Sequence, residues 1–288
     1  MSVQWTLAAS LIAIPTLVAA CAAADEELPP GQAAVAPGDV TVTATDYAFE
    51  APDTIAAGLT TFRLVNNGDQ LHMAQLIRFE PGKTLDDFLV AYDEAFRTKG
   101  PRPSWATRLG GPGAAEPRER SNATHHLEPG SYAWICLMNI PDGIPHVLKG
   151  KMAKPFVVRD ASPDAVSRRV PDADVVIRLV EYSFDISAPL GTGRQVIRVE
   201  NQGAEPHEIA VLKLAPGKTS RDLELWMQNP AGPPPASSVG GVSSLAANRE
   251  AYFEVELSEG EYVLLCLVTA PDGRPHTAHG MIQYIRIG

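Results

Sequence analysis

The sequence predicts an all-β protein made of two tandem domains that share one fold. The chain holds 25 prolines and 23 glycines among 288 residues and has few long helical patterns, as expected for short strands joined by turns. Apolar and polar residues alternate with a period of two in many segments. Residues 40–158 are repeated as residues 175–287. With 45% hydrophobic and 20% charged residues, the composition is that of a globular protein.

The repeat is defined by motifs that recur at two constant offsets. At an offset of 135 residues, Asp46-Tyr47-Ala48-Phe49 corresponds to Glu181-Tyr182-Ser183-Phe184, and His72 corresponds to His207. After a change of length the offset is 130, and the pairs include Gly110-Gly111 with Gly240-Gly241, Cys136 with Cys266 and His146 with His276. Two domains of one fold follow from this repeat.

Strands and one helix are expected in each copy. Residues 40–45, 61–65, 175–180 and 196–199 are expected to be strands, and residues 252–257 alternate as a half-buried strand does. The helical signals are at residues 84–96 and 219–227. Each begins with a Thr that has an Asp three residues later, a pattern typical of a capping box.

The first twenty residues are predicted to be an export signal, because the apolar run from Trp5 to Ala20 is short and terminal. Its end, Leu17-Val18-Ala19-Ala20-Cys21, resembles the lipobox of bacterial lipoproteins, in which the cysteine is lipidated. The resemblance implies a membrane-anchored lipoprotein on the periplasmic or extracellular side. Plain secretion and a retained anchor are the alternatives, because MSVQW lacks the Lys or Arg of a usual signal.

The remaining boundaries follow from composition and from the repeat. We expect a flexible tether at 21–38, domain 1 at 39–160, a polar linker at 161–174 and domain 2 at 175–288. Exported proteins often carry disulfides, so a bond between Cys136 and Cys266 is one alternative. The repeat argues against it, because two equivalent interior positions would have to meet within the ~7 Å Cα limit of a disulfide.

Each copy offers the same four candidate metal donors in the same order. A His follows an Asn-x-Gly turn, and Cys, His and Met come later: His72, Cys136, His146 and Met152 in the first copy, His207, Cys266, His276 and Met281 in the second. A thiolate, two neutral imidazoles and a weak thioether suit a mononuclear copper site. An isolated Cys or His is more often a core residue, but four ordered donors found twice favour a metal.

This ordered set resembles the cupredoxins, or type 1 blue copper proteins. It is similar above all to the type 1 domain of copper nitrite reductases, whose ligand loop ends in a pattern like His276-Thr277-Ala278-His279-Gly280-Met281. The resemblance implies two Greek-key β-sandwiches, each with one inserted helix and one copper. It also implies outer-sphere electron transfer through the edge of the C-terminal His, within an apolar rim of Ile144, Pro145 and Pro275. The first copy is one residue longer before Met152, which leaves its axial role open.

Other functions are weighed against electron transfer. A copper-sequestering or metal-free binding module is the alternative, because a fold does not fix a function. We expect no enzyme, because the seven histidines form no His-x-His pair of a trinuclear cluster, and neither copy supplies the further histidines of nitrite reduction. A net charge of −10 argues against nucleic acid and leaves an unspecified redox protein as the partner. His125 is expected to be a hydrogen-bonded structural residue, and His279 a surface residue.

Overall fold

The computed structural model describes residues 1, 38–139, 143–161 and 168–288. The predicted signal peptide, the lipidation site Cys21 and most of the tether lie outside the described residues, as does the middle of the predicted linker. The described residues from 38 onward belong to one compact unit. No helix in the described part of the chain is long and apolar enough to cross a membrane.

The first half of this unit is a β-sandwich. Its elements are β1 (Asp39–Thr45), β2 (Ala48–Glu50), β3 (Thr54–Ala56), β4 (Gly58–Asn66), β5 (Gln75–Phe79), α1 (Leu85–Thr98), β6 (Ala106–Arg108), β7 (Arg120–Leu127), β8 (Gly130–Ile135), α2 (His146–Lys149) and β9 (Ala153–Arg159). One layer has the order β2-β1-β4-β7 and the other β3-β9-β8-β5-β6. The chain crosses between the layers after β4 and after β7, so β4 pairs with β1 and β7, and β5 pairs with β8, none of which is its neighbour in sequence, as in a Greek key.

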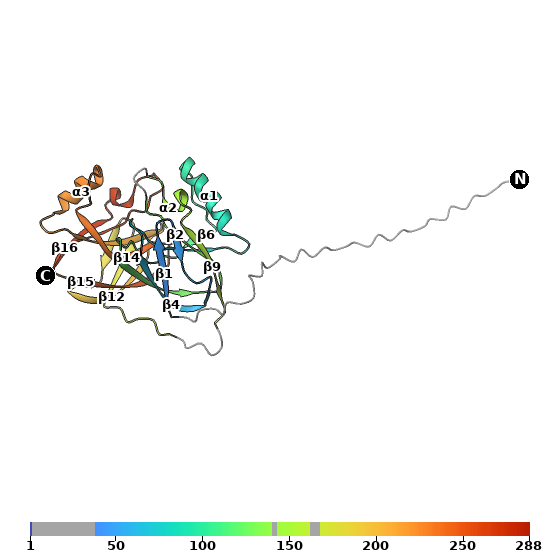
Figure 1. Cartoon of the computed structure of the whole chain (residues 1–288), viewed down its shortest axis with the longest axis horizontal. Coiled ribbons are helices and arrows are strands. Elements are labelled where there is room, and N and C mark those ends of the chain that lie inside the picture. The colour runs from blue at the N-terminus through green and yellow to red at the C-terminus, as the bar shows by residue number, and fades with distance from the viewer. Residues whose placement is uncertain (2–37, 140–142, 162–167) are drawn as a thin grey trace. The chain divides into compact units, whose positions relative to one another are not determined.

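The second half repeats this plan. Its elements are β10 (Val175–Val180), β11 (Ser183–Ile186), β12 (Gly193–Asn201), β13 (His207–Leu214), α3 (Ser220–Gln228), β14 (Ala236–Leu245), β15 (Glu250–Leu257), β16 (Gly260–Leu265), the 3₁₀ turn η1 (His276–His279) and β17 (Ile282–Ile287). Its layers are β11-β10-β12-β15 and β14-β13-β16-β17. Figure 1 shows the two halves as a blue-to-green and a yellow-to-red set of strands.

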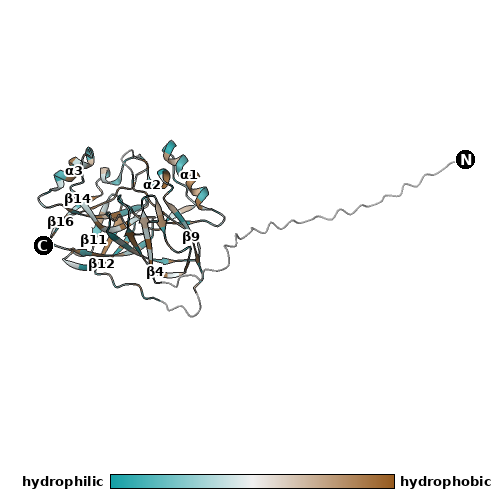
Figure 2. Cartoon of the chain, viewed as in Figure 1, coloured by the Kyte–Doolittle hydropathy of each residue, from teal (hydrophilic) through white to brown (hydrophobic). Residues whose placement is uncertain are grey.

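Alternating burial places one core inside each sandwich. Strand β1 has the burial pattern of a strand with one inward face, and its inward residues Val40, Val42 and Ala44 pack with residues of both layers. A matching cluster fills the second half. The apolar strands lie at the centre of the molecule in Figure 2, whereas the helices carry polar residues on one side. The prediction of an all-β sandwich fold is confirmed.

The inserted helices form where the sequence predicts them. Thr84 caps α1 and Thr219 caps α3, and each makes the reciprocal capping box with the Asp three residues later. Phe88 and Tyr92 of α1 pack against strands β5 and β8 on the outer face of their layer. One further short turn in each half, α2 or η1, lies in the loop that carries the second histidine.

The two halves meet through equivalent segments. Pro112 is bridged to Val242, the residue to which it corresponds at the offset of 130, and the amide of Gly113 donates to the carbonyl of Gly241 at 3.1 Å. Strands β7 and β15, which also correspond, pair antiparallel at Thr124 and Tyr252 and join their layers into one eight-stranded sheet. The halves are therefore related as the subunits of an isologous dimer are.

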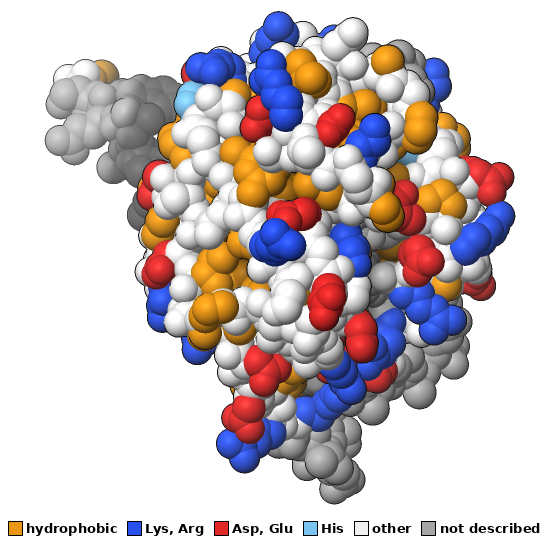
Figure 3. Space-filling model, turned by 90° about the vertical axis from the view of Figure 1, so that its left-hand side faces the viewer, with side chains coloured by type: hydrophobic (Ala, Val, Ile, Leu, Met, Phe, Trp, Pro, Cys, Tyr) orange, Lys and Arg blue, Asp and Glu red, His pale blue; other side chains and the backbone are white. Residues whose placement is uncertain are grey.

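Acidic and basic side chains alternate over the face of the molecule shown in Figure 3, with apolar side chains between them. In the second half of the chain, ion pairs join Arg198 to Glu250 and Arg194 to Glu254. Exposed pairs of this kind contribute little to stability, typically about 0–1 kcal/mol each. The surface on this side therefore carries no extended field of one sign.

Candidate metal centres

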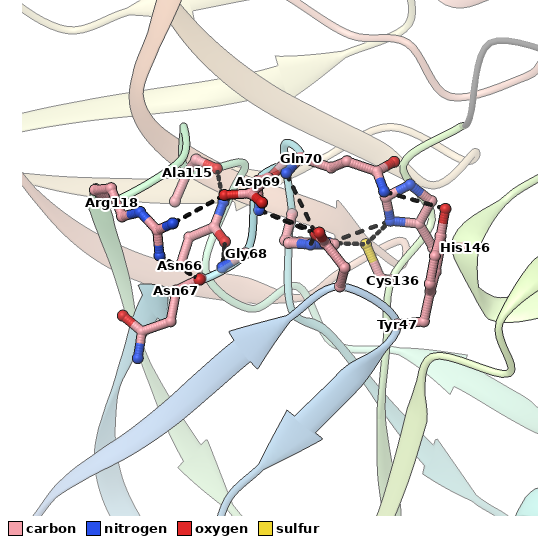
Figure 4. A network of polar contacts seen from close by, with 12 residues as sticks. Tyr47, Asn66, Asn67, Gly68, Asp69, Gln70, Ala115, Arg118, Cys136 and His146 are labelled. Carbon is pink, nitrogen blue, oxygen red and sulfur yellow. Dashed lines mark hydrogen bonds and ion pairs between the residues drawn. The ribbon is translucent and has the colours of Figure 1, made fainter.

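The first candidate site brings His72, Cys136 and His146 together inside the first sandwich. The Nδ1 atom of His146 lies 3.2 Å from Nδ1 of His72 and 3.5 Å from Sγ of Cys136, and the thiol lies 3.8 Å from Nδ1 of His72. All three side chains are buried. Figure 4 shows Cys136 and His146 with their side chains pointing toward each other. We refer to this cluster as site 1.

The second candidate site repeats this geometry with His207, Cys266 and His276. The two Nδ1 atoms are 2.9 Å apart, and Sγ of Cys266 is 3.4 Å from Nδ1 of His276. The three residues are buried, and their donor atoms lie within 4.8 Å of one another, as they do in site 1. We refer to this cluster as site 2. Both cysteines are free thiols, so the disulfide alternative is not realised.

Backbone hydrogen bonds hold the Cys and the second His of each site at fixed positions. In site 1, the amide of Val147 donates to the carbonyl of Cys136 at 2.9 Å, and the amide of His146 donates to the carbonyl of Met138 at 2.8 Å. Site 2 has the same two bonds, from Thr277 to Cys266 and from His276 to Val268. The ligand loop is thus tied to the end of the strand that carries the thiol.

The extra residue before Met152 is Lys151, which follows the turn and has a φ of +52°. In both halves the glycine that ends the turn, Gly150 or Gly280, donates its amide to the carbonyl of the second histidine. As a result, Met152 and Met281 take the same place. Each methionine amide donates to the carbonyl of the preceding ligand-loop His, and each methionine carbonyl accepts from the amide of the site's Cys. Both side chains are buried in the core cluster that contains that Cys.

The first histidine of each site is positioned by the Asn-x-Gly turn before it. The buried side chain of Asn66 donates to the carbonyls of Gln70 and Ala115, at 2.7 and 2.9 Å, and accepts from the amide of Gly68. Asn201 makes the corresponding bonds in the second half. A Cβ on Gly68 would lie 2.8 Å from Nε2 of His72, and a Cβ on Gly203 would lie 2.7 Å from Nε2 of His207. Glycine is therefore required beside each imidazole.

The sequence did not reveal the carboxylates that contact these imidazoles. Nε2 of His72 is 3.0 Å from Oδ1 of Asp46, and this hydrogen bond is the main reason that the pKa of Asp46 is lowered. In site 2, Nε2 of His276 is 3.1 Å from Oε2 of Glu205. One signal was available in the sequence, because the repeated motif begins with an acidic residue in both copies, Asp46 and Glu181. In the structure each of these residues lies beside the first histidine of its site.

Burial sets the protonation states in both sites. Burial raises the pKa of the Cys136 thiol to about 12, and the pKa of Cys266 is raised as well. Burial lowers the pKa of His207 to about 4 and also lowers the pKa values of His146 and His276. His146, His207 and His276 are therefore neutral, and both thiols are protonated, near neutral pH.

The donor set fits a soft cation such as copper. Two imidazoles turn their Nδ1 atoms towards a thiol, while their Nε2 atoms face outward. The amide of Glu208 donates to Sγ of Cys266 at 3.3 Å, which favours a thiolate there. Neutral imidazole and thiolate are the donor types that copper prefers. Within the described residues, these two sites are the groups of three or more His, Cys, Asp or Glu that could share one ion.

The surroundings of the second histidine bear on the expected electron path. This histidine is buried in each site, since His146 is 1% and His276 is 0% exposed. Tyr47 and Tyr182 cover these rings edge-on, with centroids 5.2 and 5.1 Å away. Of the expected rim, Pro275 is exposed and Ile144 is half-buried, but Pro145 is buried.

Three other histidines, His125, His126 and His279, stay outside both sites, and His126 is exposed. His125 is buried, and burial lowers its pKa to about 4, but its Nε2 has no hydrogen-bond partner, which differs from the expectation of a hydrogen-bonded residue. His279 is partly exposed, hydrogen-bonded to Asp272 and stacked on Tyr182 at 4.6 Å.

The Greek-key sandwiches and the two His/Cys/His groups together fit the type 1 copper motif of the cupredoxins. The structure of the chain is similar to auracyanin from Roseiflexus castenholzii, with 22% identity, a TM-score of 0.28, and coverage of 39% of this chain and 94% of that one. Auracyanin A, a "blue" copper protein from Chloroflexus aurantiacus, has 21% identity and a TM-score of 0.29, covering 43% and 99%.

A copper-containing nitrite reductase from Thermus scotoductus matches 88% of this chain and 62% of its own, with 14% identity and a TM-score of 0.25. The similar structures thus include an enzyme as well as a "blue" copper protein. No protein-family model and no curated protein matches the sequence. The assignment of the sites consequently depends on their own geometry.

Proposed function

We propose that this chain is an exported type 1 copper protein that mediates outer-sphere electron transfer, with one copper in each half. The observation that supports it most directly is the convergence of two Nδ1 atoms and one Sγ atom, twice, inside a sandwich. Copper bound there supplies a one-electron Cu(II)/Cu(I) couple. The protein residues hold the donors rigidly, since the ligand loop is hydrogen-bonded to the thiol-bearing strand, and burial excludes water from the donors.

In this proposal His72, Cys136 and His146 bind copper in site 1, and His207, Cys266 and His276 bind it in site 2, with Met152 and Met281 as weak axial donors. A distant thioether tunes the potential without imposing a tetragonal geometry. We propose no catalytic role, because neither half supplies the additional histidines that a second, substrate-binding copper would need. The copper-sequestering or metal-free alternative predicts no reversible one-electron reduction.

The test is reconstitution with Cu(II) of the soluble chain from residue 38 onward. We expect two coppers per chain and an intense thiolate-to-copper absorption in the visible range. Cys136→Ser and Cys266→Ser should each remove half of the colour, and the double variant should remove all of it. His279→Gln is the matched control, because His279 lies beside site 2 without joining its donors. Folded protein that stays colourless with Cu(II) would refute electron transfer.

We also propose that the mature protein is anchored to a membrane through a lipid on Cys21 and exchanges electrons with a redox protein on the periplasmic or extracellular side. The support is the lipobox-like sequence. Cys21→Ala in the full chain should move the protein from the membrane fraction to the soluble fraction and stop incorporation of a labelled fatty acid. Unchanged membrane association with no labelling would indicate a retained signal anchor.

A further inference from the structure

The two sites differ at a position whose side chain contacts a ligand histidine in one of them. Gln70 and Glu205 correspond at the offset of 135, and each stands two residues before the first histidine of its site. The backbone at this position is held in the same way in both halves, because Asn66 and Asn201 donate to its carbonyl at 2.7 and 2.8 Å. The difference between the halves is therefore an amide in one and a carboxylate in the other.

Glu205 is fixed between two donors in site 2. One oxygen of its carboxylate is 3.1 Å from Nε2 of His276, and the other accepts from the hydroxyl of Tyr182 at 3.3 Å. Tyr182 itself packs edge-on against His276. Because the Nε2 proton is engaged by Glu205, the lone pair of His276 is on Nδ1, the atom that faces Cys266. Glu205 thus selects the tautomer that can bind a metal.

Gln70 makes a different contact in site 1. Its Nε2 donates to the hydroxyl of Tyr47 at 3.1 Å, as Figure 4 shows, and it brings no charge to His146. The carboxylate of site 1 instead comes from Asp46 and contacts His72.

The residue of the second half that corresponds to Asp46 makes no hydrogen bond to its histidine. Glu181 accepts from the backbone amide of Ala204, and Nε2 of His207 is buried without a hydrogen-bond partner. Each site therefore has one carboxylate-bound imidazole, but it is the first histidine in site 1 and the second in site 2. A Cβ on Gly203 would touch both Glu181 and His207, so the Glu181 carboxylate still lies next to the imidazole.

We propose that Glu205 is a positioning residue that orients His276 and holds site 2 at a lower reduction potential than site 1, where Gln70 takes its place. This inference rests on the proposed copper-binding function. A carboxylate that accepts a hydrogen bond from a ligand imidazole makes that imidazole more basic, and a more basic ligand stabilises Cu(II) over Cu(I). Site 2 lies beside the carboxylates of Glu181, Glu205 and Glu208, whereas the corresponding residues of site 1 are Asp46 and the neutral Gln70 and Met73. Of these differences, the one at position 205 acts directly on a ligand imidazole.

The test is a reciprocal exchange in single-site proteins. Cys136→Ser leaves site 2 alone to be measured, and Cys266→Ser leaves site 1. In a spectroelectrochemical titration of the visible band, E205Q should shift the equilibrium of site 2 towards Cu(I) about tenfold, equivalent to about 59 mV for a one-electron couple. Q70E should shift site 1 towards Cu(II) by a similar factor. E205D, which keeps the charge, should recover part of the parental potential.

The outcomes separate this inference from the function on which it rests. One outcome is that the single-site parents bind copper and are blue, but neither E205Q nor Q70E changes the Cu(II)/Cu(I) equilibrium more than twofold. The proposed role of Glu205 is then overturned, and the copper function stands. A site 2 potential above that of site 1 also overturns it. If both parents stay colourless with Cu(II), the proposed function itself fails. Should E205Q not fold, Q70E alone decides, because it adds a charge to an intact site.

Discussion

Copper binding should release close to one proton per site at neutral pH. In the metal-free protein, burial raises the pKa of Cys136 to about 12 and also raises that of Cys266, so both thiols are protonated. The pKa of His207 is lowered to about 4 and that of His276 is lowered too, so the imidazoles of site 2 are already neutral. A ligand thiol must lose its proton to bind, but these histidines have none to lose.

The magnitude follows from linkage. Between the low pKa values of the imidazoles and the high pKa of the thiol, the apparent affinity should rise tenfold, or about 1.36 kcal/mol, for each unit of pH. From pH 6 to pH 8 the gain is about 100-fold, and it should be lost again as the pH falls. Below about pH 4, protonation of His207 should make the dependence steeper.

The assay is titration calorimetry of the Cys136→Ser protein with Cu(II) at pH 7 in phosphate and in Tris. The dependence of the observed enthalpy on the ionisation enthalpy of the buffer gives the number of protons released. A value near zero would show that Cys266 does not bind or is already ionised, and a value near two would show that an imidazole is protonated before binding. The double cysteine variant is the control and should show no such release.

Three further predictions concern the fold. Gly241→Ala should lower the free energy of unfolding by roughly 2–6 kcal/mol in urea titrations, because a Cβ there would overlap the carbonyl oxygen of Ile209 and the backbone φ is +128°. Gly273→Ala is the control: this glycine has open space around it, so the substitution should cost about 1–3 kcal/mol from backbone strain alone. Thr219→Ala should cost about 1 kcal/mol of unfolding free energy by removing a helix cap. His125 has a folded pKa of about 4 against an ordinary 6.5, so its neutral form stabilises the fold above pH 6.5, and this contribution is lost as the pH falls towards 4. His125→Phe should therefore reduce the loss of unfolding free energy between pH 7.5 and pH 4.5 by roughly 2–3 kcal/mol. An unchanged pH dependence in this variant would contradict the burial of His125 as a neutral imidazole.

The sequence was sufficient for the features that local pattern and repetition determine. The capping box at Thr84 and the alternation in β1 depend on residues close together in the chain, so their structures could be predicted. The order His, Cys, His, found twice, was enough to predict which side chains converge. Repetition carried most of this inference, because one Cys or one His by itself is better explained as a core residue.

The sequence was not sufficient where contacts join distant segments. Asp46 and Glu205 lie in turns, and nothing in their residue types shows that they face His72 and His276. The contact of Tyr182 with His276 could not be predicted for the same reason, since Tyr182 belongs to the turn after β10 and covers the ring from there. The repeat likewise gave no indication that the segments around Gly113 and Gly241 meet across the interface between the halves.

The differences between the halves are informative because the interface relates them so closely. Equivalent segments pair with each other at Pro112 and Val242, so the two halves are folded and held in the same way. Residue differences between the halves that affect only packing should then be spread over the surface and the core, with no concentration near the donors. Near the donors, however, position 70 or 205 changes an amide for a carboxylate while its backbone contacts stay the same. Because the backbone contacts are the same, this difference in charge alters the electrostatic environment of the ligand histidine and leaves the backbone of position 70 or 205 in place. Two identical sites would give one potential, whereas two sites that differ in this way would give the chain two.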